Sequence, residues 1–276
     1  MKITNLGTRD YASFYVACEL YKQMSQQCHS KLGLATGGTM IEVYKFLVDL
    51  LKKNKLDVSQ IETFNLDEYV GLDANHAQSY HTYMNNVLFK RYPHFNLSLL
   101  HVPNGNAMDL DEETKRYENL INQQGPVDIQ ILGIGENGHI GFNEPGTDVN
   151  SATHIVNLTE STINANSRYF ENEAEVPKQA ISMGLSTILK AQRIILLAFG
   201  EKKREAIEKL AENEVNSEVP ATILHAHPNV EIYVDDDAAP RLKWVSFNHT
   251  EKGKHFKRKI LKRKILKRKH SQMRLW

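Results

Sequence analysis

The sequence predicts an α/β fold in which a mostly parallel sheet carries helices on both faces. Two observations support this prediction. Short apolar runs of strand length alternate along the chain with segments whose apolar residues recur at helical spacing. Polar or glycine-containing stretches separate these segments. Strands that alternate with helices are typical of parallel sheets that helices cover on both sides.

The first half of the chain supplies most of the predicted elements. Residues 40–54 show a clear helical period, because their apolar side chains share one face: Ile41, Tyr44, Leu47, Val48 and Leu51. The strand before this helix stops at the glycines of Thr36-Gly-Gly-Thr39. In order, we expect helices at 10–28, 40–54, 79–91 and 109–123, and strands at 31–35, 61–66 and 97–102.

The second half continues the alternation. Residues 127–132 form a strongly apolar strand that leads into a long glycine-rich loop. A strand at 193–199, a helix at 202–212 and a strand at 230–234 follow. We expect residues 1–250 to form one domain of this kind, since the length suffices for a single buried core.

The charge is unevenly distributed. The chain has 34 Lys and Arg against 33 Asp and Glu, but residues 251–276 hold 12 of the bases and a single acid. The body therefore carries a net charge of −10 and the tail is strongly basic. We do not expect the body to bind nucleic acid, and no apolar run approaches the roughly 18 residues of a membrane span. Two cysteines and no leader-like N-terminus predict a cytoplasmic protein.

The tail repeats Lys-Arg-Lys-Ile-Leu with a period of five residues from 257 to 269. This period gives neither a helix nor a strand a continuous apolar face, so we expect residues 251–276 to be disordered. Two interpretations remain open. The tail attaches to nucleic acid or an anionic membrane surface, or it is a terminal extension without a role in the chemistry.

Functional residues of a parallel sheet lie at the carboxyl ends of its strands. The segment Thr36-Gly37-Gly38-Thr39 follows one strand and opens a helix. Glycines allow close approach of the backbone, and the helix start offers N–H groups, so this segment is a candidate phosphate site. It lacks the lysine of a Walker motif, and a tight turn with a threonine cap is the alternative.

Two further strand ends carry titratable side chains. Asp67 and Glu68 follow the strand at 61–66 and could supply a general base, or an Asp that caps the next turn. The loop after residue 132 contains Asn137, His139 and Glu144. Its literal G-x-G-x-x-G does not predict a dinucleotide site, because later glycines and a proline oppose the helix that such a site requires. We therefore interpret His139 as an acid–base residue rather than a structural one.

Cations near strand ends suit an anionic substrate. Arg168 and Lys203 are the candidates, and solvent-exposed charge is the alternative for each. We predict no metal site, since His225 and His227 lack a third ligand at a usual spacing.

Several separate segments together resemble the glucosamine-6-phosphate deaminase family, also called isomerases. They are Thr36–Thr39, Phe64–Leu72, Gly138–Pro145 and Ala165–Arg168. The resemblance spans residues 1 to about 245 and implies a Rossmann-like sheet. It also implies a cofactor-free enzyme that we class as a hydrolase acting on an amino sugar phosphate.

The resemblance further implies roles for single residues. His139 would open the sugar ring, with Asn137 and Glu144 orienting it, and Asp67 would move the C2 proton. The segment Thr36–Thr39, with Arg168 and Lys203, would hold the phosphate. Family members activated by N-acetylglucosamine 6-phosphate carry a basic pair where this chain has His154 and Val156, so we expect weak or absent activation.

Two other functions remain as alternatives. A 6-phosphogluconolactonase-type hydrolase would share the sheet and the phosphate site. A non-catalytic sugar-phosphate sensor would use the same residues for binding alone. In all three cases the partner is a small sugar phosphate, and the sequence leaves self-association open.

Overall fold

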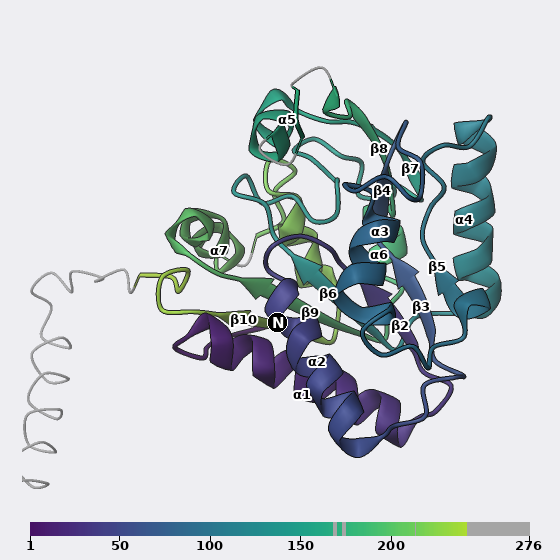
Figure 1. The fold of residues 1–276 in the computed structure, drawn as a ribbon. Helices are drawn as coiled ribbons and strands as arrows, with labels where there is room; N and C mark the ends of the chain where they lie inside the picture. The colour runs from purple at the N-terminus through teal and green to yellow at the C-terminus, as the bar shows by residue number, and fades with distance from the viewer. Residues whose placement is uncertain (168–169, 173–174, 213, 242–276) are drawn as a thin grey trace, which may run out of the picture. The chain divides into compact units, whose positions relative to one another are not determined.

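A seven-stranded parallel sheet forms the centre of the structure, a computed structural model of the chain (Figure 1). The structure describes residues 1–167, 170–172, 175–212 and 214–241. Every element below belongs to one compact unit, Met1–Pro240. The predicted tail, 251–276, lies outside the described residues.

The strand order is β1-β10-β9-β6-β2-β3-β5, and every neighbouring pair is parallel. The bounds are Lys2–Asn5 (β1), Lys31–Leu34 (β2), Glu62–Asn65 (β3), Leu100–His101 (β5), Ile129–Gly133 (β6), Arg193–Ala198 (β9) and Val230–Val234 (β10). The predicted α/β fold is therefore confirmed. The sequence reading missed β1, a short edge strand that pairs with β10, because it has little apolar pattern of its own.

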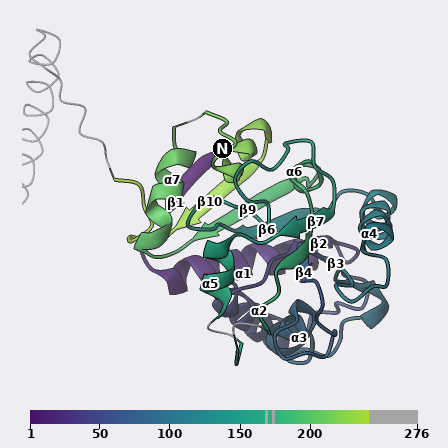
Figure 2. The same ribbon diagram turned by 90° about the horizontal axis from the view of Figure 1, so that it is seen from above.

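Helices pack on both faces of this sheet. Figure 2 shows α1 and α2 on one face and α6 on the other. The helices are Arg9–Gln26 (α1), Ile41–Asn54 (α2), Tyr80–Met84 (α3), Leu110–Gln124 (α4), Glu160–Ser167 (α5), Leu185–Ile188 (α6) and Arg204–Leu210 (α7). A π-helical turn, Asn85–Phe89, completes the helix predicted at 79–91, and the strand predicted at 97–102 shrinks to β5 after a 3₁₀ turn, Leu97–Leu99. Two more 3₁₀ turns are Glu201–Lys203 and Pro220–Ala226.

A second, antiparallel sheet was not predicted. Its strands are Asp67–Tyr69 (β4), His154–Asn157 (β7) and Gln179–Ser182 (β8), in the order β4-β8-β7. It packs on a small apolar cluster of its own: Tyr69, Phe142, Val156, Leu158 and Ala180. This sheet matters for the site because Asp67 is its first residue on β4.

The start of α1 is fixed by its surroundings. Gly7 has a positive φ of 83°, and its carbonyl accepts the Asp236 N–H beyond β10. The Thr8 hydroxyl then accepts the Tyr11 N–H at 3.2 Å, which caps the helix. Arg9 therefore begins α1 in a defined place next to the end of β10.

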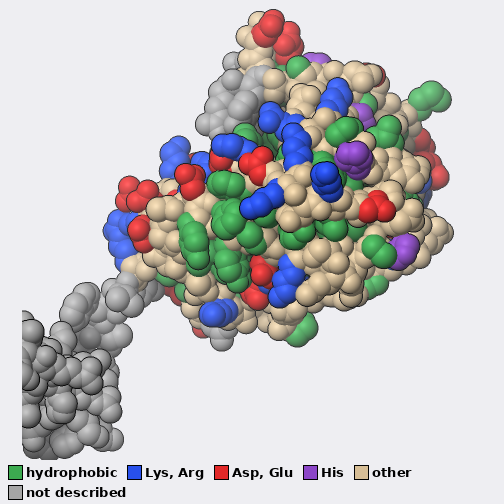
Figure 3. Space-filling view, turned by 60° about the horizontal axis from the view of Figure 1, so that its bottom comes forward, with side chains coloured by type: hydrophobic (Ala, Val, Ile, Leu, Met, Phe, Trp, Pro, Cys, Tyr) green, Lys and Arg blue, Asp and Glu red, His purple; other side chains and the backbone are tan. Residues whose placement is uncertain are grey.

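The face formed by α1 and α2 carries exposed hydrophobic side chains, including Tyr11, Phe14 and Ile41. Figure 3, which brings the lower side of Figure 1 forward, shows hydrophobic patches between charged side chains on this side of the molecule. Among the helices in the described ranges, none is long and apolar enough to cross a membrane.

Candidate active site

A cavity of about 1000 Å³ opens at the carboxyl ends of the central strands. Its lining includes these residues predicted from the sequence: Thr36, Gly37, Gly38, Thr39, Asp67, Asn137, His139 and Lys203. Glu144 is buried behind Asn137 and His139. Arg168 lies outside the described residues. The structure thus gathers the described candidates from four different strand ends into one place.

The segment Thr36–Thr39 joins β2 to α2. Gly37 has a φ of +91°, a conformation that L side chains rarely adopt. Its carbonyl accepts the Met40 N–H at 3.1 Å, which closes a tight turn before the helix. The predicted tight turn is therefore present, but no threonine caps the helix, because the cap position of α2 is Met40 and makes no side-chain cap hydrogen bond. The turn lines the cavity, and its role as a phosphate site stays a prediction.

Asp67 lies directly after β3 and opens β4, where it pairs with Ser182 of β8. Its side chain is buried, and Gly141 approaches it so closely that a Cβ there would lie 3.6 Å from Asp67 Oδ2. Burial, and then the charge of Glu68, raise the pKa of Asp67 to about 8. No hydrogen bond from the described residues reaches this carboxylate, so its charge is uncompensated when ionised.

Glu68 has a different role from its neighbour. Its carboxylate accepts three backbone N–H groups, from Tyr69, Tyr80 and His81, at 2.9–3.0 Å. Two of these N–H groups open α3, whose cap residue is Ser79, so Glu68 adds to the capping of that helix, a role that we considered for Asp67. Burial raises the pKa of Glu68, and these hydrogen bonds oppose that rise.

The long loop after β6 contains no helix at its G-x-G-x-x-G. The His139 ring packs against Gly135, where an added Cβ would lie 2.4 Å from the ring. His139 Nδ1 is 3.4 Å from Glu144 Oε2, within ion-pair range but outside good hydrogen-bond geometry. A substrate that touches the ring from the cavity side would face a histidine backed by a carboxylate.

Among the described residues, no hydrogen bond joins Asn137 to the His139 ring, but Asn137 contacts both of its neighbours in the site. Its side-chain amide donates to Glu144 Oε2 at 2.7 Å, and its carbonyl oxygen accepts the backbone N–H of His139 at 3.2 Å. Asn137 therefore orients the carboxylate behind the ring and the backbone of His139 itself. That Asn137 and Glu144 together orient His139 stays a prediction.

Glu144 also receives two hydroxyls that the sequence reading missed. Thr162 donates to Glu144 Oε1 at 2.5 Å, and Thr159 donates to the same oxygen at 3.3 Å. Thr159 also caps α5, since its hydroxyl accepts the Thr162 N–H at 3.3 Å. The sequence could indicate the cap, but not a partner more than a dozen residues away.

These contacts keep Glu144 ionised. Burial raises the pKa of its carboxylate, but the His139 ring, the Thr162 hydroxyl and the Asn137 amide outweigh burial and lower the pKa to about 2. The site therefore holds one fixed negative charge, on Glu144, and one carboxyl that retains its proton up to about pH 8, on Asp67.

Lys203 ends the 3₁₀ turn after β9 and lines the cavity. Lys202 beside it pairs with Glu136 at 3.5 Å. Within the described residues, no group of three or more His, Cys, Asp or Glu is arranged to hold a metal ion. His227, one of the weak metal candidates, instead contacts the backbone carbonyl of Ala191.

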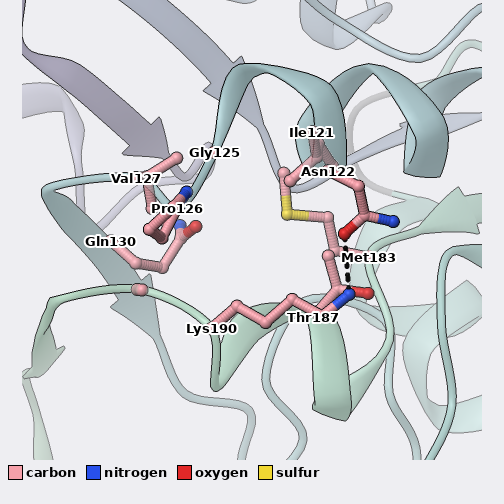
Figure 4. A pocket seen from close by; sticks show the side chains of 10 residues that line it. Ile121, Asn122, Gly125, Pro126, Val127, Gln130, Met183, Thr187 and Lys190 are labelled. Atoms are coloured by element: carbon pink, nitrogen blue, oxygen red, sulfur yellow. Dashed lines mark hydrogen bonds between the residues drawn. The ribbon is translucent and has the colours of Figure 1, made fainter.

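A second cavity, of about 300 Å³, lies between α4, α6 and the start of β6 (Figure 4). Its lining is mainly apolar and includes Ile121, Val127 and Met183. Lys190 borders it and donates to Asn122 at 2.9 Å. The predicted site residues that the structure describes do not line this cavity.

A parallel sheet with a glycine turn, a buried carboxylate and a histidine–carboxylate pair around one cavity at its strand ends defines the chain as an α/β protein with a small-molecule site at that edge of the sheet. The chain belongs to the family of glucosamine-6-phosphate isomerases and 6-phosphogluconolactonases, whose model matches residues 10–233.

Individual relatives agree with this assignment. A glucosamine-6-phosphate deaminase from Staphylococcus saprophyticus is 85% identical over 242 residues, which are 88% of this chain and 100% of that protein. The structure of a monomeric glucosamine-6-phosphate deaminase aligns with a TM-score of 0.84 and 44% identity, over 86% of this chain and 98% of that one. A 6-phosphogluconolactonase from Trypanosoma cruzi aligns with a TM-score of 0.68 and 17% identity, over 88% and 97%, which shows the shared fold alone.

Proposed function

We propose that the chain is a glucosamine-6-phosphate deaminase that converts D-glucosamine 6-phosphate and water to D-fructose 6-phosphate and ammonia. The observation that carries the proposal is the placement of Asp67 and His139 in the lining of one cavity that also contains the glycine turn. The 85% identical relative bears the same name. Because the relatives are named deaminases and the family isomerases, the hydrolase class expected from the sequence is corrected to an isomerase and deaminase.

The first step is ring opening. The sugar is a closed hemiacetal, so its anomeric O–H must lose a proton and the ring oxygen must gain one. His139 can accept the first proton and deliver the second, because an imidazole exchanges protons near neutral pH. Glu144 stays ionised and stabilises the ring while it carries the extra proton.

The second step moves hydrogen between carbons. Asp67, once ionised, removes the proton from C2 of the open chain, and the electron pair forms a C1–C2 double bond while the π electrons of the C1 carbonyl move to O1. O1 takes up a proton, which the ammonium group on C2 can supply, so the product is an enol at C1 with an amine on C2. Return of the proton to C1 leaves a C=N bond at C2. Water then adds to C2 and ammonia leaves, which gives the ketose. Each positioned acid–base group is worth about 10²–10⁴ in rate.

The remaining candidate residues bind the substrate at its phosphate group, which is distant from the reacting carbons. We propose that the turn Thr36–Thr39 and Lys203 bind the phosphate, with Arg168 as a further cation. The phosphate is remote from the bonds that change, so its binding energy positions C1 and C2 against His139 and Asp67. All steps are proton transfers and addition of water, so we propose that the reaction needs no cofactor.

The test measures ammonia and fructose 6-phosphate released from glucosamine 6-phosphate by the full chain. Release of both supports the proposal. Hydrolysis of 6-phosphogluconolactone without ammonia release would instead identify the lactonase alternative. Binding of the amino sugar phosphate without turnover would identify the sensor.

A further inference from the structure

Two carbonyl groups of the glycine turn accept hydrogen bonds from side chains that the sequence did not predict for the site, one of which, Tyr83, also lines the cavity. The Tyr83 hydroxyl, at the end of α3, donates to the Gly37 carbonyl at 2.8 Å. The Arg9 guanidinium, at the start of α1, donates to the Gly38 carbonyl. Neither residue belongs to the segments that carried the family resemblance.

These two hydrogen bonds fix two successive peptide planes. In a planar trans peptide, the C=O and the N–H of the next residue point in opposite directions. Holding the Gly37 carbonyl therefore orients the Gly38 N–H, and holding the Gly38 carbonyl orients the Thr39 N–H. The Gly37 carbonyl also accepts the Met40 N–H at 3.1 Å, so Tyr83 reinforces a peptide plane that the backbone already holds. Arg9 holds the Gly38 carbonyl, in a turn whose glycines have no side chain to restrict the backbone.

Arg9 also adds a positive charge next to the turn. Its guanidinium lies 5.7 Å from the centre of the Phe199 ring, which follows β9. The guanidinium is therefore held both by this ring and by the Gly38 carbonyl. A cation on a carbonyl oxygen polarises the peptide and makes its N–H a stronger donor. This charge is useful because residues 1–250 carry a net charge of −10, which opposes the approach of an anion.

We propose that Arg9 and Tyr83 are positioning residues that aim the Gly38 and Thr39 amides at the phosphate of the substrate. The proposal rests on the proposed function for the identity of the substrate. The two residues act through the turn and take no part in the proton transfers. Their removal therefore weakens phosphate binding and leaves the chemical step unchanged.

The experiment compares three substitutions in the full chain. Arg9→Met removes both the charge and the hydrogen bond, Arg9→Lys keeps the charge, and Tyr83→Phe removes only the hydroxyl. Calorimetry with inorganic phosphate measures binding, and steady-state assays measure KM and kcat for glucosamine 6-phosphate. Tyr11→Phe and Lys115→Met are matched controls at exposed positions that do not line the cavity.

We expect Arg9→Met to raise the Kd for phosphate and the KM about tenfold, Tyr83→Phe to raise both about fivefold, and Arg9→Lys to lie between wild type and Arg9→Met. The kcat of each variant should stay within about twofold of the wild-type value. The hydrogen bonds to the turn are the same in the substrate complex and in the transition state, so their loss does not change the barrier between the two. The controls bind phosphate as the wild type does. A general loss of structure would instead lower the melting temperature and kcat together.

Wild-type phosphate affinity in Arg9→Met and Tyr83→Phe would overturn the proposal, and so would a loss of kcat at unchanged KM. The absence of measurable phosphate binding by the wild type would also overturn it. Weakened phosphate binding in the variants of a protein that releases no ammonia would leave the positioning role standing while the proposed function fails.

Discussion

Two inward-facing carboxylates of this protein have opposite surroundings. Glu118 of α4 accepts four hydrogen bonds at 2.7–3.0 Å, from the N–H and hydroxyl of Thr153, the hydroxyl of Thr187 and the ammonium of Lys190. Burial raises the pKa of Glu118, but these donors outweigh burial and lower it to about 2. Asp67 has no donor of this kind among the described residues, and its pKa rises to about 8.

The difference separates a carboxylate that holds elements together from one suited to exchange protons. Glu118 links α4 to the segment before β7 and to α6, and two of its partners, Thr187 and Lys190, line the small cavity. Its negative charge is stabilised, so it binds firmly and resists protonation. Asp67 faces the large cavity, where its ionised form is poorly stabilised and therefore a stronger base. The following predictions test this contrast in order of decreasing effect.

The largest effect is expected from Asp67→Asn. It removes the proposed base, so kcat for ammonia release should fall by about 10²–10⁴, while glucosamine 6-phosphate still binds. The same change removes a buried charge at pH 8, which should increase the free energy of unfolding. The melting temperature should rise by about 2–4 °C for each kcal/mol of that increase. Ammonia release and thermal melts check both parts, and unchanged turnover would remove Asp67 from the mechanism.

The pH dependence of catalysis should follow Asp67. Because the base must be ionised, kcat/KM is expected to rise about tenfold per pH unit until about pH 8. Glu144 stays ionised through this range, since its pKa is about 2. The pH–rate profiles of wild type and of Glu118→Gln should show the same rise of kcat/KM with pH. A profile that is flat between about pH 6 and 8 would contradict the assignment.

Stability should depend on pH in the opposite sense at the two carboxylates. Folded Asp67 keeps a proton that the unfolded chain releases above its ordinary pKa near 4, so its contribution weakens the fold as pH rises from about 4 to 8. Folded Glu118 has a lowered pKa, so its contribution is present above about pH 4.5 and is lost as pH falls towards 2. When the free energy of unfolding is measured by urea titration across this pH range, Asp67→Asn should lack the fall between about pH 4 and 8.

A smaller effect, on stability alone, is expected from Glu118→Gln. The substitution leaves Lys190 and two threonines without their charged partner, so the free energy of unfolding should fall by about 2 kcal/mol. Because Glu118 is remote from the large cavity, kcat should stay near the wild-type value. Urea titration and the ammonia assay below the melting temperature measure the two quantities. A large fall in kcat in the folded variant would contradict the interpretation of Glu118 as a carboxylate that serves stability alone.

The smallest effects come from a matched pair of threonines. Thr162 donates to Glu144, and Thr187 donates to Glu118. Thr162→Val should lower kcat about three- to tenfold with little change in KM, because Glu144 loses the hydroxyl that fixes it behind His139. Thr187→Val should lower stability by about 1 kcal/mol and spare kcat. Restored kcat in Thr162→Ser would assign the loss to the hydroxyl, and equal kcat losses in both valine variants would refute the distinction.

Much of the central sheet could be predicted because most of its strands are apolar runs bounded by turns. The strands β1, β7 and β8 could not, since each has only four residues and polar residues at both ends, which leave no apolar period to detect. The strand-end rule located the turn Thr36–Thr39, Asp67 and His139, because sheet topology alone brings strand ends together.

The supporting contacts could not be found in the same way. Thr162 reaches Glu144, Arg9 reaches Gly38 and Tyr83 reaches Gly37 across distances in sequence that only the folded chain closes. Nor could the sequence assign Glu68, rather than Asp67, to the cap of α3. Local pattern predicts elements, whereas these contacts depend on how the elements pack.

The pairing of β1 with β10 has a consequence for synthesis. It joins residues 2–5 to residues 231–234, so the edge of the sheet cannot close until nearly the whole Met1–Pro240 unit has left the ribosome. The Gly7 carbonyl, just before Arg9, also accepts the Asp236 N–H beyond β10. A nascent or truncated chain that stops before Val234 therefore carries Asp67, His139 and Glu144 but lacks the edge pairing and the contact that anchor the chain before α1.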